Sequence, residues 1–308
     1  MRTRSIGRLR TSVIGLGCNN FGGRLDEAAT KNVLDAAIDN GVTFLDTADI
    51  YGATKSEEFM GRVLAGRREK VVIATKFGSS LGSDVPGGAA PGYVKLALQA
   101  SLRRLKVDHV DLYQLHRPDD SVPIADTLGA LAELVAEGLV REIGCSNFSA
   151  EQLDEAEAAA RASGGPRFVS VQNEYSLLKR DAEAEVLPAC GRLGIGFLPY
   201  FPLFSGLLTG KYRRGQPMPA GTRITGNPRW EAHVTDANLD LIERLSTYAE
   251  EHGMELIDLA FAWLLAKPQV SSVIAGATTA AQVARNAKAA EFELSPRQVA
   301  EIDAILDG

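Results

Sequence analysis

The chain has 308 residues, of which 45% are hydrophobic and 23% are charged, and its formal net charge is −6. This composition excludes a disordered chain, and the lack of a long basic stripe argues against nucleic acid as the main partner. No apolar run reaches the roughly 18 residues that span a bilayer, so we expect no membrane segment. The three cysteines, Cys18, Cys145 and Cys190, lie far apart and are odd in number, which predicts free buried thiols in a reducing cytoplasm.

Short apolar runs alternate with stretches of helical spacing along the chain. Most of these runs are apolar at successive positions, as expected for parallel strands that are covered on both faces. The candidate strands are Val13–Gly17, Val42–Asp46, Val71–Lys76, Val110–His116, Glu142–Cys145, Val169–Asn173, Ile195–Pro199 and Ser272–Ala275. Because no linker or change in composition separates them, they predict an α/β fold with one (β/α)₈ barrel domain over residues 1–308.

Polar residues mark the start of several predicted helices. Ser149–Gln152 and Thr279–Gln282 are each typical of a capping box, and Ser295 precedes a proline at the first helical position. The interval between the seventh and eighth candidate strands is too long for one βα unit. It holds a segment rich in Pro, Gly and Arg, Phe201–Asp236, which we expect to be a binding loop or lid.

Two glycine-rich stretches imitate nucleotide-binding loops but are incomplete. Gly15–Asn20 lacks the third glycine of a dinucleotide fingerprint, and Gly206–Tyr212 is one residue short of a P-loop. A nucleotide would therefore have to bind without either loop.

Titratable side chains follow three of the apolar runs. Asp46, Lys76 and His116 each stand at the end of a candidate strand, and Tyr51 lies five residues after Asp46. Because the carboxyl ends of barrel strands meet at one mouth, we expect these four side chains to lie close together.

These residue types suit one kind of chemistry. A buried Lys76 needs a partner, which Asp46 can supply. A cation beside Tyr51 favours the phenolate and lowers the pKa of Tyr51, and a neutral His116 can donate a hydrogen bond to a substrate oxygen. Such a set can polarise and protonate a carbonyl, and the electron pair must then come from a cofactor.

The sequence around these residues resembles the aldo-keto reductases, and the resemblance continues in order almost from end to end. The matching segments are FLDTADIYG at 44–52, IATK at 73–76, DLYQLH at 111–116, IGCSNF at 143–148, VQNEYS at 171–176, PL at 202–203, GLLTGKY at 206–212 and IAGA at 274–277, followed by Asn286.

The resemblance implies a (β/α)₈ TIM barrel with an N-terminal β-hairpin at its base and extra helices. It also implies reduction of an aldehyde or ketone with NADPH. Tyr51 would be the proton donor, Lys76 would tune its pKa, Asp46 would hold Lys76, and His116 would orient the carbonyl.

The resemblance further implies how the cofactor is held. Ser146, Asn147 and Gln172 would bind the carboxamide of the nicotinamide, and Tyr200 would stack on its ring. The remaining cofactor-binding residues would be Gly17, Asp46, Leu203, Ser205, Gly206, Lys211, Gly276, Ala277, Thr278, Gln282 and Asn286.

The cofactor segments depart from the family pattern in ways that leave NADH possible beside NADPH. Phe201 stands where a polar Ser is frequent, and Ala275 where Pro is frequent. No basic residue lies within Gly276–Gln282, where the adenosine 2′-phosphate is commonly bound. Arg285 or Lys288, one turn further on, could supply that charge.

We expect a small-molecule carbonyl substrate to contact Asn19, Phe21, Phe77 and Trp230, whereas Tyr113 is better explained by packing. Specificity should depend on the segments Arg213–His233 and Ser79–Gly92.

Two other functions stay open at this point, because a fold alone does not determine function. One is a nucleotide-responsive binding module, like the channel β subunits that share this fold. The other is a different barrel enzyme with a phosphate site after the last two strands. The sequence predicts neither the oligomeric state nor the identity of the substrate.

Overall fold

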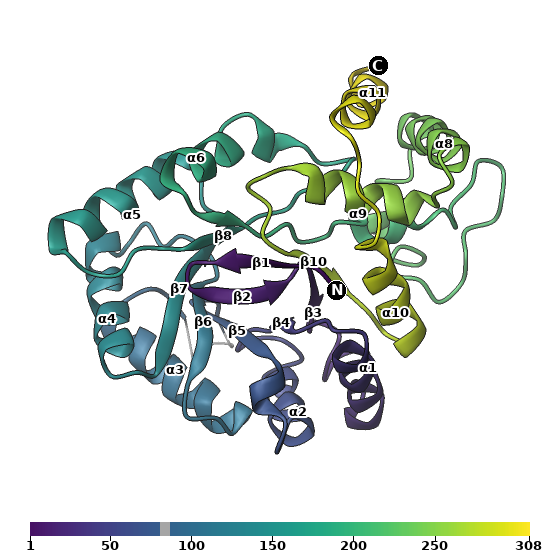
Figure 1. Ribbon diagram of the computed structural model, residues 1–308. Coiled ribbons are helices and arrows are strands. Elements are labelled where there is room, and N and C mark those ends of the chain that lie inside the picture. The colour runs from purple at the N-terminus through teal and green to yellow at the C-terminus, as the bar shows by residue number, and fades with distance from the viewer. Residues whose placement is uncertain (81–86) are drawn as a thin grey trace.

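The computed structural model describes residues 1–80 and 87–308. In this part of the chain, eight parallel strands form a curled sheet in the order β10-β3-β4-β5-β6-β7-β8-β9. They are β3 (Ile14–Gly17), β4 (Phe44–Asp46), β5 (Val72–Phe77), β6 (Val110–Leu115), β7 (Val140–Ser146), β8 (Ser170–Gln172), β9 (Gly196–Phe197) and β10 (Val273–Gly276). Figure 1 shows them as the inner ring of a (β/α)₈ barrel.

The eight predicted strands are confirmed, with their ends shifted by at most two residues. Every residue of β6 is buried, as expected when barrel side chains cover one face and helices cover the other. The ring closes between β9 and β10 through the single bridges Phe197 to Val270 and Tyr200 to Ile274, not through a continuous ladder. The expected strand Ile195–Pro199 is therefore shorter than its apolar run suggests.

An antiparallel hairpin of β1 (Thr3–Ile6) and β2 (Leu9–Ser12) covers the base of the barrel, as the family resemblance implies. Figure 1 shows it lying across the centre of the strand ring. Ile6 and Leu9 pack on the lower barrel core, which comprises Phe44, Ala74, Leu112, Leu198 and Ile274. The two-residue turn requires a left-handed residue at Gly7, where a Cβ would lie 2.9 Å from Glu142 Cδ.

Helices surround this ring. They are α1 (Glu27–Asp39), α2 (Lys55–Val63), α3 (Pro91–Leu105), α4 (Ile124–Ala136), α5 (Ala150–Ser163), α6 (Val186–Leu193), α7 (Pro228–Glu231), α8 (Asp236–Glu251), α9 (Leu256–Ala266), α10 (Ala280–Ala289) and α11 (Pro296–Asp307), with 3₁₀ turns η1 (Arg68–Lys70), η2 (Asp181–Glu183) and η3 (Phe204–Thr209). None of the described helices is long and apolar enough to cross a membrane.

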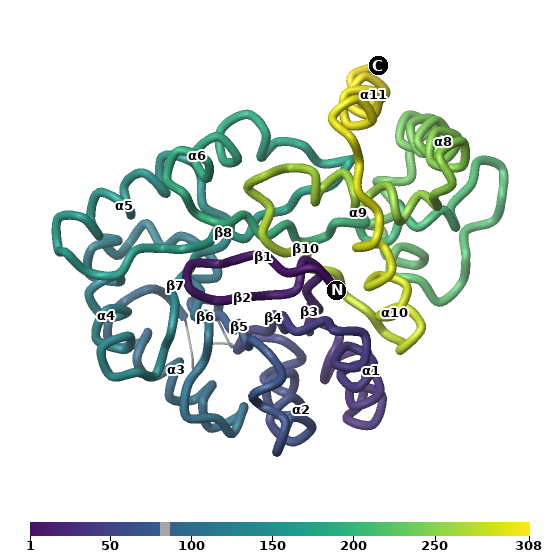
Figure 2. The backbone as a smooth tube through the Cα atoms, viewed as in Figure 1, coloured from purple at the N-terminus to yellow at the C-terminus, as the bar shows by residue number. Residues whose placement is uncertain are grey.

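The long interval before β10 contains η3, α7, α8 and α9. Ten of the eleven α9 residues are buried, because α8 and η3 pack against that helix and α11 in turn packs against α8. Figure 2 traces the chain from the N-terminus over the barrel base to the C-terminus in the peripheral α11.

Two of the three predicted helix starts have the expected geometry. Ser149 with Gln152, and Ser295 with Gln298, form complete capping boxes. For the third helix start, only one of the two hydrogen bonds of the predicted capping box forms. Thr279 accepts a hydrogen bond from the Gln282 backbone, but Gln282 Oε1 accepts from the backbone N–H of Thr278 at 2.7 Å instead of that of Thr279.

Candidate functional site

A cleft of about 960 Å³ opens at the carboxyl ends of the barrel strands. The last residues of five strands line it: Gly17, Asp46, Ser146, Gln172 and Gly276. Strand pairing sets them side by side, because Gly17 is in register with both Asp46 and Gly276, and Ser146 with Gln172. Barrel enzymes carry their reacting groups at this end.

The structure brings Asp46, Lys76 and Tyr51 together beside this cleft. The Lys76 ammonium donates to Asp46 Oδ2 at 2.7 Å and to the Thr47 carbonyl at 2.9 Å, and it lies 3.4 Å from the Tyr51 hydroxyl. Lys76 is 0% exposed and Asp46 2%. A buried ammonium is tolerated here because it has a carboxylate partner and further hydrogen bonds.

The second oxygen of Asp46 is also fully used. Asp46 Oδ1 accepts from Gln172 Nε2 at 2.9 Å and from Gln114 Nε2 at 3.2 Å. The contact from Gln172 adds a structural role to a residue that was expected to contact the cofactor. Gln114 is not among the predicted site residues, although an amide within the predicted strand Val110–His116 was the available signal.

The protonation states of this cluster follow from burial and charge. Burial raises the pKa of Tyr51 above its ordinary value of 10, although the Lys76 charge acts to lower it. The expected net decrease in the pKa of Tyr51 is therefore wrong for this state of the protein. Burial alone would lower the pKa of Lys76, but Asp46 and Tyr51 raise it overall, so the ammonium stays charged.

His116 completes the predicted set. Its ring packs edge-on against the Tyr51 ring, with 5.9 Å between the ring centroids. Burial, helped by the Lys76 charge, lowers the pKa of His116 to about 3, so the imidazole is neutral at physiological pH. Its Nδ1 atom is buried without a hydrogen-bond partner among the described residues.

Next to His116, four polar residues line one corner of the cleft. The Ser146 hydroxyl donates to the Gln172 carbonyl at 2.7 Å, and the Tyr200 hydroxyl donates to Asn147 Oδ1 at 2.9 Å. Asn147 Nδ2 in turn donates to the His116 carbonyl at 2.9 Å. These bonds hold Ser146, Asn147 and Tyr200 at fixed positions beside the titratable cluster.

The segment after β9 approaches the cleft in an unusual conformation. Phe204, Ser205 and Gly206 have φ values of 45°, 57° and 105° in succession. The Ser205 hydroxyl is buried and has no hydrogen-bond partner in the described part of the chain. A strained segment that carries an unsatisfied buried polar group is typical of a binding site.

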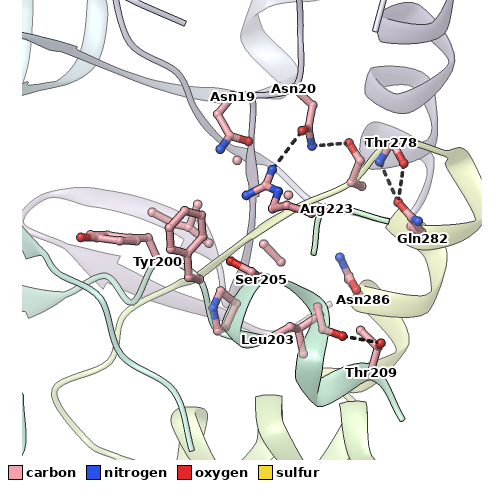
Figure 3. A pocket seen from close by; sticks show the side chains of 18 of the residues that line it. Asn19, Asn20, Tyr200, Leu203, Ser205, Thr209, Arg223, Thr278, Gln282 and Asn286 are labelled. Atoms are coloured by element: carbon pink, nitrogen blue, oxygen red, sulfur yellow. Dashed lines mark hydrogen bonds between the residues drawn. The ribbon is translucent and has the colours of Figure 1, made fainter. Parts of the chain in front are cut away.

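Three cations lie along this part of the cleft: Arg24, Lys211 and Arg223. None forms an ion pair with a described residue. Burial and the nearby Arg24 charge lower the pKa of both Lys211 and Arg223, as expected for positive charges held together in a partly desolvated site. Arg223 Nη2 donates to Asn20 Oδ1 at 3.0 Å, and Figure 3 shows this bond across the cleft.

Thr278, Gln282 and Asn286 lie at the end of the cleft far from Tyr200 (Figure 3). Neither of the two basic residues expected at this end presents an unpaired charge to the cleft. Arg285 Nη1 lies 2.6 Å from Asp258 Oδ1, and Arg285 Nη2 lies 3.1 Å from Glu255 Oε2, so its charge is neutralised. Lys288 does not line the cleft. Arg223 and Arg24 are not among the predicted cofactor residues, because their sequence neighbours give no sign that they face the cleft.

The structure corrects half of the expected substrate contacts. Asn19 and Trp230 line the cleft. Phe21 and Phe77, both 0% exposed, lie in the hydrophobic core. Side chains alternate along β5, so Lys76 points into the barrel and Phe77 points outward, where it stacks on Tyr113 with 4.6 Å between the ring centroids. The segment Ser79–Gly92 includes residues 81–86, which lie outside the described part of the chain.

Comparisons with known proteins agree with this geometry. The model of the aldo/keto reductase family matches residues 13–307. A probable aldo-keto reductase 1 of Glycine max is 37% identical over 94% of this chain and 84% of its own length.

Two further relatives are similar to a comparable degree. The uncharacterized oxidoreductase YrpG of Bacillus subtilis is 36% identical over 97% of this chain and 94% of its own length. A probable voltage-gated potassium channel subunit beta of Oryza sativa is 36% identical over 99% and 97%. With a barrel that carries its polar cleft at the strand ends, and with matches of this extent, the chain belongs to the aldo/keto reductase family.

Proposed function

We propose that this chain reduces an aldehyde or ketone to an alcohol with NADPH, and that Tyr51 donates the proton. The observation that carries the proposal is the position of Lys76. Its buried ammonium lies 2.7 Å from Asp46 and 3.4 Å from the Tyr51 hydroxyl, at a strand end beside the cleft.

Each residue of the cluster has a separate role in this reaction. Burial keeps Tyr51 protonated at neutral pH, so the phenol is ready to donate as negative charge develops on the carbonyl oxygen. The Lys76 ammonium stabilises the phenolate that remains, and Asp46 holds the ammonium in place. The neutral His116 can orient the carbonyl oxygen by hydrogen bonding. The nicotinamide cofactor, when bound, supplies the hydride that adds to the carbonyl carbon.

The cleft fits such a cofactor along its length. Ser146, Asn147, Gln172 and Tyr200 would hold the nicotinamide beside Tyr51. The unsatisfied Ser205 hydroxyl and the neighbouring Leu203 and Gly206 would face the pyrophosphate, with Lys211 and Gly17 close by. Gly276, Ala277, Thr278, Gln282 and Asn286 would hold the adenosine half.

We infer a preference for NADPH over NADH from the three unpaired cations. A pyrophosphate carries two negative charges at most, whereas Arg24, Lys211 and Arg223 provide three positive charges. The additional phosphate of NADPH makes better use of this excess. Because the three cysteines are free and buried, we also propose a reducing cytoplasmic location.

The test compares the wild type with Tyr51→Phe in NADPH oxidation over a panel of aldehydes and ketones. We expect the variant to bind NADPH with unchanged affinity and to lose most of its turnover, because the ring remains and the proton does not. Equal turnover by both proteins would reject Tyr51 as the acid.

A binding module is the second candidate function, because the rice relative named as a probable channel β subunit is similar over almost the whole chain. Tight NADPH binding without turnover of any carbonyl in the panel would favour this function over the reductase.

A further inference from the structure

Two guanidinium groups line the cleft in addition to the three cations described above. Arg117 follows His116 directly, and Arg229 lies in the short helix α7. Both side chains are exposed, and neither forms a hydrogen bond or an ion pair with a described residue. Arg285 lines the same cleft but is neutralised by two carboxylates, so the free state of Arg117 and Arg229 is not a general property of this surface.

Arg117 lies at the reacting end of the cleft. It is the next residue after His116, whose ring contacts Tyr51, and its charge contributes to the low pKa of His116 after burial and Lys76. A group bound by Arg117 would therefore belong to a molecule that also reaches Tyr51.

Aromatic contacts connect Arg229 to the same end. The guanidinium lies 5.0 Å from the centre of the Trp230 ring, and Trp230 packs edge-on against Phe201 with 5.4 Å between the centroids. Phe201 packs edge-on against Tyr200 at 5.2 Å, and the Tyr200 hydroxyl is bonded to Asn147. Arg229 is thus connected through three aromatic side chains to the corner lined by Asn147.

Of the other three cations, Arg223 borders the same Phe201 ring and extends from it toward the opposite end of the cleft. Arg223 lies 5.5 Å from the centre of the Phe201 ring and is bonded to Asn20. Figure 3 places it between Tyr200 and Gln282, along the path toward the adenosine end. The phosphates of the cofactor therefore account for Arg223 and its neighbours but leave Arg117 and Arg229 without a role.

The reacting end has a net positive charge. Among the acids that line the cleft, Asp46 is paired with Lys76, and Glu255 is paired with Arg285. Glu174 is the remaining lining acid in the described part of the chain, and it opposes two arginines. Burial raises the pKa of Glu174 above its ordinary value.

Resting on the proposed reductase function, we propose that the preferred substrates are aldehydes or ketones that also carry a carboxylate, and that Arg117 and Arg229 bind this carboxylate. The planar guanidinium matches a carboxylate through two parallel hydrogen bonds. The carbonyl would then lie between Tyr51 and His116, with the anionic group toward the rim of the cleft. Both arginines are specificity-determining residues and take no part in the proton transfer.

A matched substrate pair tests this proposal. 4-Carboxybenzaldehyde and 4-formylbenzamide have the same size and planarity and differ in charge. With NADPH we expect the wild type to favour the carboxylate about tenfold in kcat/KM, mainly through a lower KM. The preference should fall as the ionic strength increases, because both arginines are exposed.

Arg117→Gln and Arg229→Gln should each lower kcat/KM for the carboxylate about three- to tenfold and change that for the amide less than twofold. The double variant should remove the preference. Arg213→Gln is the control, because Arg213 is an exposed arginine of the same Arg-rich segment that does not line the cleft. Thermal melting of each variant verifies that it is folded.

The possible failures are distinguishable. If the wild type reduces both aldehydes equally well and the variants leave this ratio unchanged, the carboxylate preference is wrong and the reductase function stands. If the wild type reduces neither these aldehydes nor any member of the general panel, the proposed function itself is wrong and the preference falls with it.

Discussion

Gln172 Nε2 lies 2.9 Å from Asp46 Oδ1, so a residue expected to contact the nicotinamide also holds the partner of the buried lysine. The same oxygen accepts from Gln114 Nε2 at 3.2 Å, while Asp46 Oδ2 accepts from Lys76. The proposed nicotinamide contact and the position of Lys76 are therefore coupled through one carboxylate. Of the two glutamines, only Gln172 connects this carboxylate to the cleft, because Gln172 lines the cleft and Gln114 does not.

Substitution of the two glutamines should separate these roles. In Gln172→Ala, we expect both a weaker affinity for NADPH and a lower kcat, because one side chain serves two contacts. In Gln114→Ala, we expect a lower kcat with an unchanged NADPH affinity. Each loss of a hydrogen bond to a charged group should cost about 1.5–3 kcal/mol. Titration calorimetry and steady-state kinetics measure the two effects, and identical profiles for both variants would contradict the coupling.

Removal of the buried ammonium should affect stability as well as turnover. Lys76→Met leaves the Asp46 carboxylate buried without its cation, which should lower the free energy of unfolding by about 3–5 kcal/mol. The double variant Lys76→Met with Asp46→Asn should recover most of this loss, because no unpaired charge remains, but it should stay inactive. Urea denaturation measures the stabilities. A double variant as unstable as Lys76→Met would mean that the ion pair is not the cause.

The pH dependence of turnover should show no contribution from His116 near its ordinary pKa of 6.5. The folded protein keeps this imidazole neutral until the pH falls to about 3, so its hydrogen-bonding state is constant across the physiological range. We expect kcat/KM to have no break between pH 5 and pH 8 that depends on His116. A break near 6.5 that disappears in His116→Gln would show that the ring titrates.

Much of this barrel was predictable from local patterns. Parallel strands such as β4 and β5 begin with apolar residues at successive positions, and the polar residues Asp46 and Lys76 stand at or next to their ends. The capping boxes at Ser149 and Ser295 depend on four consecutive residues. These features are determined by neighbours in the sequence, and the structure confirms them.

Other features depend on residues that are distant in the sequence. Whether Arg285 is free depends on Asp258, 27 positions earlier, and whether Arg223 faces the cleft depends on Asn20, 203 positions away. The outward direction of Phe77 required the register of β5 against β6. Sequence patterns predict which strand-end side chains lie together, but they do not determine which surface charges are already paired.

A second buried carboxylate near Tyr51 should make stability depend on pH. Asp49 is 1% exposed, and neither of its carboxylate oxygens has a hydrogen-bond partner among the described residues. Burial, with the nearby Glu57 charge, raises the pKa of Asp49 to about 7. Between about pH 4 and pH 7 the folded state therefore keeps a proton that the unfolded chain releases, so stability falls as the pH rises.

Asn is a close mimic of the protonated Asp49. We expect Asp49→Asn to be more stable than the wild type at pH 8 by about 2–4 kcal/mol and to differ little at pH 4. Chemical denaturation at the two pH values measures the difference. An equal effect of the substitution at both values would mean that Asp49 has the same charge in the folded and unfolded states.

The last prediction concerns the choice of cofactor, and it contrasts two arginines of the same cleft. Arg223 is free of carboxylates, whereas Arg285 is bound to Asp258 and Glu255. Arg223→Gln should weaken NADPH binding about tenfold or more and NADH binding less, because the variant loses one of the charges that we propose to bind the additional phosphate. Arg285→Gln should leave the ratio of the two affinities unchanged and instead lower stability, because it leaves the buried Asp258 unpaired. Calorimetric titration of both variants with both cofactors measures these affinities. If the ratio of NADPH to NADH affinity changed only in Arg285→Gln, the additional phosphate would bind at α10 and not at the Arg-rich segment.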